Sequence, residues 1–148
     1  MVTARTILSA IRAALEAMEP DGRYALDGET FAPTWLVAPD EDDIFESMRD
    51  LLCQPLLGGP LVVGQSMVYP LSVAIVGAAY KGERTSYLSS TPMTAMERMH
   101  GMGMHVLETI YTLPIHGCMI QPLGYEMPTR SDPPDFLTTD ALFTVITT

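Results

Sequence analysis

The sequence predicts an α+β protein, in which a small mixed or antiparallel sheet of about four to five strands is flanked by an N-terminal helix and a second long helix. Two stretches, residues 3–18 and 95–113, repeat apolar side chains at helical spacing, and short apolar runs bounded by proline or glycine make up most of the rest. The chain has 148 residues, 47% of them hydrophobic and 18% charged. That length and composition suit a single domain, residues 1–148, with one core.

The first helix is predicted over Thr3–Met18. Ile7, Ile11 and Leu15 recur every four residues and form one apolar stripe. Alanines between them raise the helix propensity. Pro20, followed by an Asp-Gly turn signal, ends the helix.

The next segment, residues 19–50, is acidic and contains ten of the eighteen Asp and Glu residues. A short strand is predicted at Thr34–Val37, between two prolines. The run Asp40–Asp43 is interpreted as a solvated loop that caps a helix, whose apolar face would consist of Ile44, Met48 and Leu51 and which would stop at Pro55. A calcium loop would need a longer series of oxygen ligands and a turn glycine, so the structural interpretation is favoured.

Residues 51–80 form thirty consecutive positions without a charge or a histidine. Three prolines interrupt them, so no run reaches the roughly 20 apolar residues of a membrane span. Strands are predicted at Leu61–Val63 and Leu71–Ala79. Because the second is apolar on both sides, we expect it to sit centrally, covered by helices or by a neighbouring subunit. Gly77 is expected to mark a bulge or a close approach.

A long polar loop is predicted at Lys81–Pro92. The second helix should then run from about Ala95 towards Leu113, with a proline just past its end. Gly101 and Gly103 each cost this helix about 1 kcal/mol relative to alanine. They indicate either a close approach by another part of the chain or a kink.

The C-terminal part is predicted to contain a strand at Met119–Leu123, a loop at Glu126–Asp135 and a closing strand at Phe136–Thr148. The closing strand carries apolar residues on both faces, so both faces are expected to find apolar cover. No internal repeat is present in the sequence.

The charge balance excludes one class of function. Eight basic and eighteen acidic residues give a net charge of −10, with a sequence pI near 4.5. Tight nucleic-acid binding requires clustered Lys and Arg and is not expected.

The N-terminus lacks the continuous apolar stretch of a signal peptide. We therefore expect a soluble protein whose two cysteines are free thiols in a reducing compartment.

The residues that could support catalysis do not form a recognisable motif. His100 and His105 are five apart, which places them on different faces of a helix and not at the spacing of paired zinc ligands. His116 and Cys118 bring two donors together, but a closed zinc site needs about four. No nucleophile or phosphate-loop motif is present. We predict no enzyme activity, no cofactor and no metal site.

Five methionines lie close together in the second helix and just before it: Met93, Met96, Met99, Met102 and Met104. Most of them are expected to fill the core, because methionine adapts to irregular gaps. The alternative is an adaptable subunit interface. A copper site is a third possibility that would need convergent thioether ligands.

As a set, these elements resemble the tail terminator (tail completion, minor tail protein U-like) family of long-tailed bacteriophages. The resemblance rests on the order of elements, namely a helix at Thr3–Met18, an early strand at Thr34–Val37, a central strand at Leu71–Ala79, a second helix and a closing strand that contains Asp140–Val145. Size and acidity also agree. It covers most of the chain and involves no signature motif.

The resemblance implies a structural virion protein located in the tail or neck and assembled in the host cytoplasm. Its subunits would form a homo-oligomeric ring, a hexamer in the family, that caps the tail-tube protein and meets the head-tail connector or stopper protein. DNA would pass through the ring without tight binding, and no membrane would be involved.

Three features depart from the family pattern: the segment Lys81–Pro92, the run Asp40–Asp43 and the density of methionines. They leave open another head-tail neck protein, such as a stopper or connector. A small intracellular enzyme or ligand-binding domain using His100, His105, His116 and Cys118 is the rival class, and a toxin-antitoxin or regulatory partner is a third. Candidate interface residues come from the two polar loops and the methionine stretch: Asp40, Glu41, Asp42, Asp43, Lys81, Glu83, Arg84, Tyr87, Met96 and Met99.

Overall fold

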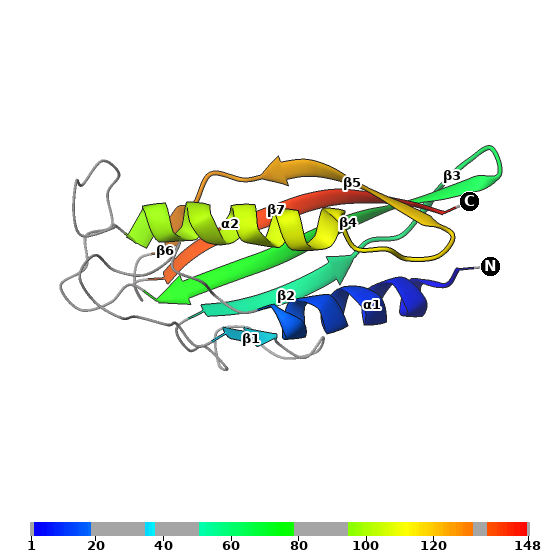
Figure 1. The fold of residues 1–148 in the computed structure, drawn as a ribbon. Helices are drawn as coiled ribbons and strands as arrows, with labels where there is room; N and C mark the ends of the chain where they lie inside the picture. The colour runs from blue at the N-terminus through cyan, green and yellow to red at the C-terminus, as the bar shows by residue number, and fades with distance from the viewer. Residues whose placement is uncertain (1, 19–34, 38–50, 79–94, 132–135, 148) are drawn as a thin grey trace.

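The computed structural model describes residues 2–18, 35–37, 51–78, 95–131 and 136–147 (Figure 1). They form two helices and seven strands: α1 (Ala4–Ala17), β1 (Trp35–Val37), β2 (Leu51–Leu57), β3 (Leu61–Val63), β4 (Ser66–Ala78), α2 (Ala95–Tyr111), β5 (Cys118–Tyr125), β6 (Thr129–Ser131) and β7 (Phe136–Thr147). The predicted α+β class is confirmed, with a mixed sheet, an N-terminal helix and a second long helix.

The strand order along the sheet is β1-β2-β4-β7-β5. β1 runs parallel to β2, and the other pairs are antiparallel. β4 and β7 pair over their whole common length, from Met67 opposite Thr147 to Ala78 opposite Phe136. β3 extends the sheet beside the start of β4, and β6 pairs with the start of β7. The two long strands that the sequence predicts therefore form the centre of the sheet.

The first helix forms as its sequence predicts. The Thr3 side chain caps it, because its Oγ1 accepts a hydrogen bond from the backbone N–H of Thr6 at 3.2 Å. Ile7, Ile11 and Leu15 are fully buried. This stripe anchors α1 against the sheet.

Both helices lie on the same face of the sheet (Figure 1). The core lies between the helices and this face of the sheet. It consists of alternate residues of the central strands and residues from one side of each helix: Leu71, Val73, Ile75, Leu137, Ala141, Phe143, Val145, Met99, Met102, Val106, Ile110 and the α1 stripe. On β7 the intervening residues, such as Leu142 and Ile146, are only partly buried. The expectation that both faces of β7 find apolar cover is therefore met by the helices on one face only.

Three local predictions were wrong. Leu51–Leu57 is strand β2, so the helix expected to continue to Pro55 does not include these residues, and the part expected before residue 51 lies outside the described residues. The predicted loop at Glu126–Asp135 contains the short strand β6. The bulge predicted as one alternative at Gly77 is absent, because Gly77 pairs regularly with Leu51 and Leu137, and the irregularity occurs instead between Pro122 and Gly124 of β5. The close approach predicted as the other alternative at Gly77 stays a prediction.

The second helix runs without interruption through Gly101 and Gly103 to Tyr111. A β-carbon at Gly103 would approach the ring of Tyr125 on β5, so this glycine permits a close approach and does not mark a break. Neither described helix combines the length and the apolar character needed to cross a bilayer.

Candidate interaction surface

Most of the interface residues that the sequence predicts cannot be placed. Eight of them lie outside the described residues: Asp40, Glu41, Asp42, Asp43, Lys81, Glu83, Arg84 and Tyr87. Met96 lies in α2, but its side chain is outside the described set. Met99 is fully buried in the core between α2 and the sheet. It is therefore unavailable to a partner, and its proposed interface role was wrong.

The histidines and cysteines are distributed over separate parts of the fold. Nδ1 of His100 lies 3.1 Å from the hydroxyl of Tyr125, and the two rings meet edge to face. His116 is exposed, whereas Cys53 is buried on β2. Burial raises the pKa of both Cys53 and Cys118, so neither thiol is activated as a nucleophile. Within the described ranges, no three His, Cys, Asp or Glu side chains are grouped to hold a metal ion.

The most distinctive surface is the sheet face that points away from the helices, here called the open face. Residues opposite one another in antiparallel strands share a face. One row of the open face contains Leu56, Ser72 and Leu142, and the next contains Pro70 and Thr144. A further row contains Val68, Ile146 and Met119, and Leu61 continues it. Apolar side chains therefore run across the open face from β3 to β5.

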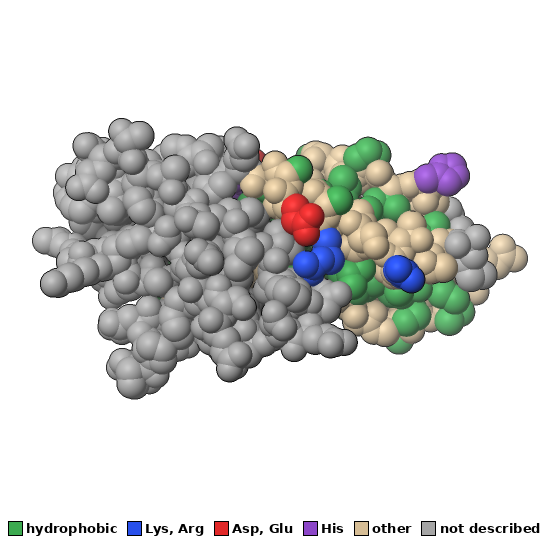
Figure 2. Space-filling model, turned by 90° about the horizontal axis from the view of Figure 1, so that it is seen from below, with side chains coloured by type: hydrophobic (Ala, Val, Ile, Leu, Met, Phe, Trp, Pro, Cys, Tyr) green, Lys and Arg blue, Asp and Glu red, His purple; other side chains and the backbone are tan. Residues whose placement is uncertain are grey.

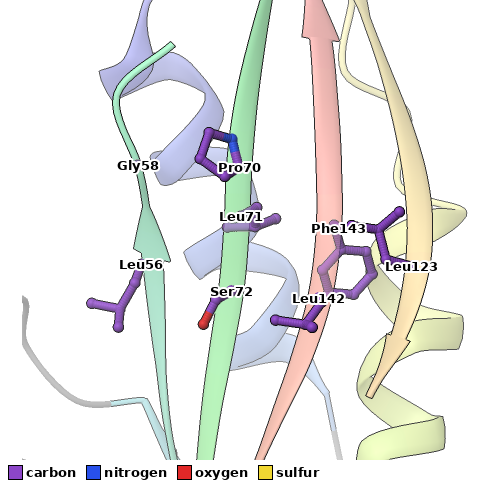
Figure 3. Close-up of a pocket in the computed structure, with 8 residues that line it drawn as sticks. All are labelled: Leu56, Gly58, Pro70, Leu71, Ser72, Leu123, Leu142 and Phe143. Carbon is purple, nitrogen blue, oxygen red and sulfur yellow. The ribbon is translucent and has the colours of Figure 1, made fainter. Parts of the chain in front are cut away.

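A hollow of about 350 Å³ opens in the middle of the open face (Figure 3). The helices lie behind the sheet in this view, so the hollow faces away from them. Among the described residues, its lining carries no charge and includes Leu56, Gly58, Pro70, Leu71, Ser72, Leu123, Leu142 and Phe143. Leu56 and Leu123 are 48% and 65% exposed. The hollow therefore offers an apolar concave site between β2 and β5.

The local backbone explains how the hollow keeps its shape at one end. The backbone N–H of Gly58 donates a hydrogen bond to the carbonyl of Pro70 at 2.8 Å. A β-carbon at position 58 would lie 2.6 Å from Cγ of Pro70, so only glycine allows this contact without displacing the ring. The residues that follow β2 therefore pack closely against β4, and the Pro70 ring lies at the wall of the hollow.

The described charges on this side of the sheet lie together at one place: Asp140 is opposite Ala74 on β4, and the backbone N–H of Glu126 donates a hydrogen bond to the Asp140 carbonyl at 2.9 Å. Burial raises the pKa of Asp140, and the nearby negative charge of Glu126 raises it further. In a view from the side of α1, charged side chains of the described residues are likewise few and lie among hydrophobic ones (Figure 2). The described surface is therefore much less charged than the net charge of −10 would suggest.

A second exposed apolar element projects from the sheet beyond the helices (Figure 1). It consists of β3, a two-residue turn and the start of β4 (residues 61–68), and is called the hairpin below. Gly64 has a φ of +62°, which suits the first position of a tight hairpin turn. Leu61, Val62 and Val63 are 69%, 71% and 62% exposed. The hairpin therefore presents three large aliphatic side chains to solvent.

Sequence reasoning located this region without identifying its residues. The uncharged stretch 51–80 indicates a need for cover, and it includes the hairpin and half of the hollow. Leu123 and Leu142 were missed, because only the pairing of β5 and β4 with β7 brings them next to Leu56 and Pro70.

The chain was compared with protein-family models and with curated proteins, and nothing matched. The bacteriophage resemblance therefore stays a prediction based on the order of elements. The open face, the hollow and the hairpin are the features that a function has to explain.

Proposed function

We propose that this chain is a structural subunit of a long-tailed bacteriophage, which forms a homo-oligomeric ring that caps the tail tube and joins the tail to the head connector. The observation that carries the proposal is the apolar open face with its hollow, which the two helices leave uncovered. No catalytic step is part of this role.

The physical need for a partner comes from the layers of the fold. A two-layer α+β domain buries one sheet face under its helices, and its other face usually carries polar side chains. Here the second face carries exposed Leu56, Met119 and Leu123 instead. Exposed apolar patches of this kind mark protein interaction sites. Neighbouring copies in a closed ring would cover such a face without leaving any subunit unpaired.

The acidity of the chain supports the same role. A ring through which DNA passes must not hold the phosphate backbone, and negative charge weakens such contacts. The net charge is −10, and ten of the eighteen acidic residues lie in residues 19–50. Most of that segment is outside the described residues. We propose that the Asp40–Asp43 and Lys81–Pro92 segments meet the axial partners or the lumen.

The test is assembly with defined partners. Purified protein would be examined by electron microscopy, alone and with tail tubes formed by the tube protein of the same genome. We expect closed rings alone, one ring at a tube end, and tubes that stop growing when it is present. Rings that bind the head connector but ignore tubes would assign the chain to another neck protein. A protein that remains a monomer at all concentrations would refute the proposal.

A further inference from the structure

We propose that the hairpin of one copy docks into the hollow of the next copy, so that the ring is closed by a head-to-tail contact. This inference rests on the proposed self-association and specifies which surfaces make it. Both surfaces are apolar, and the described residues that form them carry no charge.

The hairpin has the shape and chemistry of an inserted element. Leu61 lies opposite Val68, and Val63 lies opposite Ser66, so Leu61 and Val63 point to the same side as the open face. All three β3 residues are more than half exposed. Neither β3 nor the turn carries a charged side chain, so the charges that commonly protect an exposed edge strand are absent here. Docking would remove these side chains from water.

The hollow has room for them. A cavity of about 150 Å³ lined by aliphatic and aromatic residues accommodates benzene. The hollow is more than twice that volume, and none of the described residues that line it is charged. Two aliphatic side chains at alternate positions, such as Leu61 and Val63, match this space. Neither surface leaves a buried charge without a partner when they meet.

The contact must be made between copies. Leu61 and Val63 are fixed opposite Val68 and Ser66, which lie two and four residues before Pro70 at the wall of the hollow, or about 7 and 13 Å of extended strand. Met67 and Val68 are held in the sheet by their pairing with Thr147 and Ile146. The hairpin therefore cannot fold back onto its own hollow without losing those pairs.

Copies could also join by pairing strands at the β5 edge of the sheet, but this edge is poorly suited to it. β5 contains Pro122, which has no N–H to donate, and its register shifts before Gly124. Insertion of side chains into the hollow does not depend on that edge. Because the hairpin and the hollow are different patches, their contact repeats head to tail and closes into a ring when the rotation allows.

Three variants test the contact. The hairpin variant is Leu61→Asp with Val63→Asp, and the hollow variant is Leu123→Asp, alone or with Leu56→Asp. The control is Met127→Asp, which places the same charge on a side chain that is 70% exposed but belongs to neither surface. Circular dichroism and thermal melts verify that each variant is folded. Sedimentation should show self-association weakened at least about tenfold in the hairpin and hollow variants, and unchanged in the control.

Mixing the variants provides the decisive measurement. The hairpin variant keeps an intact hollow and the hollow variant keeps an intact hairpin, so an equal mixture should form heterodimers that do not grow further. Native mass spectrometry resolves them by mass. If the wild type forms rings and the hairpin variant forms them as well, the docking inference is overturned, while the proposed ring stands. A wild-type chain that never associates would overturn both the inference and the proposed function. Absence of heterodimers from two monomeric variants would show that the contact is not between these surfaces.

Discussion

Gly103 of α2 lies directly beneath the ring of Tyr125 on β5, where a β-carbon would approach Cγ of the tyrosine to 2.9 Å. The same tyrosine places its hydroxyl 3.1 Å from Nδ1 of His100, one turn earlier on the helix. Glycine at position 103 thus lets α2 and β5 approach closely, and the His100 contact fixes the ring there. Glycine lowers the helix propensity at this position, and the close packing of α2 on β5 offsets that cost.

We therefore expect Gly103→Ala to destabilise the protein by about 1–3 kcal/mol, although alanine is the better helix former by about 1 kcal/mol. The obstacle is the Cγ and Cβ end of Tyr125, which cannot swing away as a flexible chain end would. Urea unfolding measures the change. In a Tyr125→Ala background the same substitution should become neutral or stabilising, and a destabilisation equally large in both backgrounds would contradict this packing.

The methionines of α2 should divide by position. Met102 is fully buried, so Met102→Ala should lower the free energy of unfolding by about 2–5 kcal/mol through the lost contacts and the cavity that remains. Met104, two residues further along, is exposed, so Met104→Ala should change it by less than about 0.5 kcal/mol. Chemical denaturation of both variants provides the comparison. Similar losses at the two positions would disagree with the observed burial.

Asp140 should make the protein less stable as the pH rises. Its pKa is raised above the ordinary 3.8 by burial and then by Glu126, so the folded state holds the proton more tightly than the unfolded state. Stability from this group is greatest below the unfolded pKa and is lost as the pH rises through the raised one. Asp140→Asn should therefore be more stable than the wild type at pH 7, with a smaller advantage at pH 4. Urea titrations at both pH values measure this, and an advantage that grows on acidification would contradict it.

The two thiols should react at different rates. Cys53 is buried and its pKa is raised by burial, whereas Cys118 is only partly buried. A thiol reagent added to the native protein should modify Cys118 and leave Cys53 unmodified until the protein is unfolded in denaturant. Cys118→Ser should abolish the native reaction. Rapid labelling of the native Cys118→Ser variant would show that Cys53 is accessible.

The long elements could be predicted from sequence because their own residues determine them. The apolar stripe of Ile7, Ile11 and Leu15 predicts α1. The apolar run before the polar loop Lys81–Pro92 predicts β4, and the apolar run after the loop Glu126–Asp135 predicts β7. β2 was missed because Leu51 continues a helical spacing from Ile44 and Met48. Pro55 also suggested a helix end, yet it lies beyond the residues that pair with β1, where β2 is an edge and tolerates proline.

The surface depends on information that periodicity does not contain. A strand that is apolar on both faces needs cover on both, but the sequence does not say on which face the helices pack. The structure places α1 and α2 on one face, which leaves Leu56, Leu123 and Leu142 around the hollow. These residues come from three strands, and only their register brings them together. The uncharged character of residues 51–80 was the available signal.

We propose that copies of this chain cover one another's open faces in a closed ring. Native mass spectrometry of the wild-type protein over a range of concentrations tests it most directly. We predict a single assembly of fixed mass, which the family resemblance implies to be six copies. Its mass should stay the same as the concentration rises, with no larger species. A chain that stays monomeric throughout, or one that grows into an open-ended series of masses, would contradict the account.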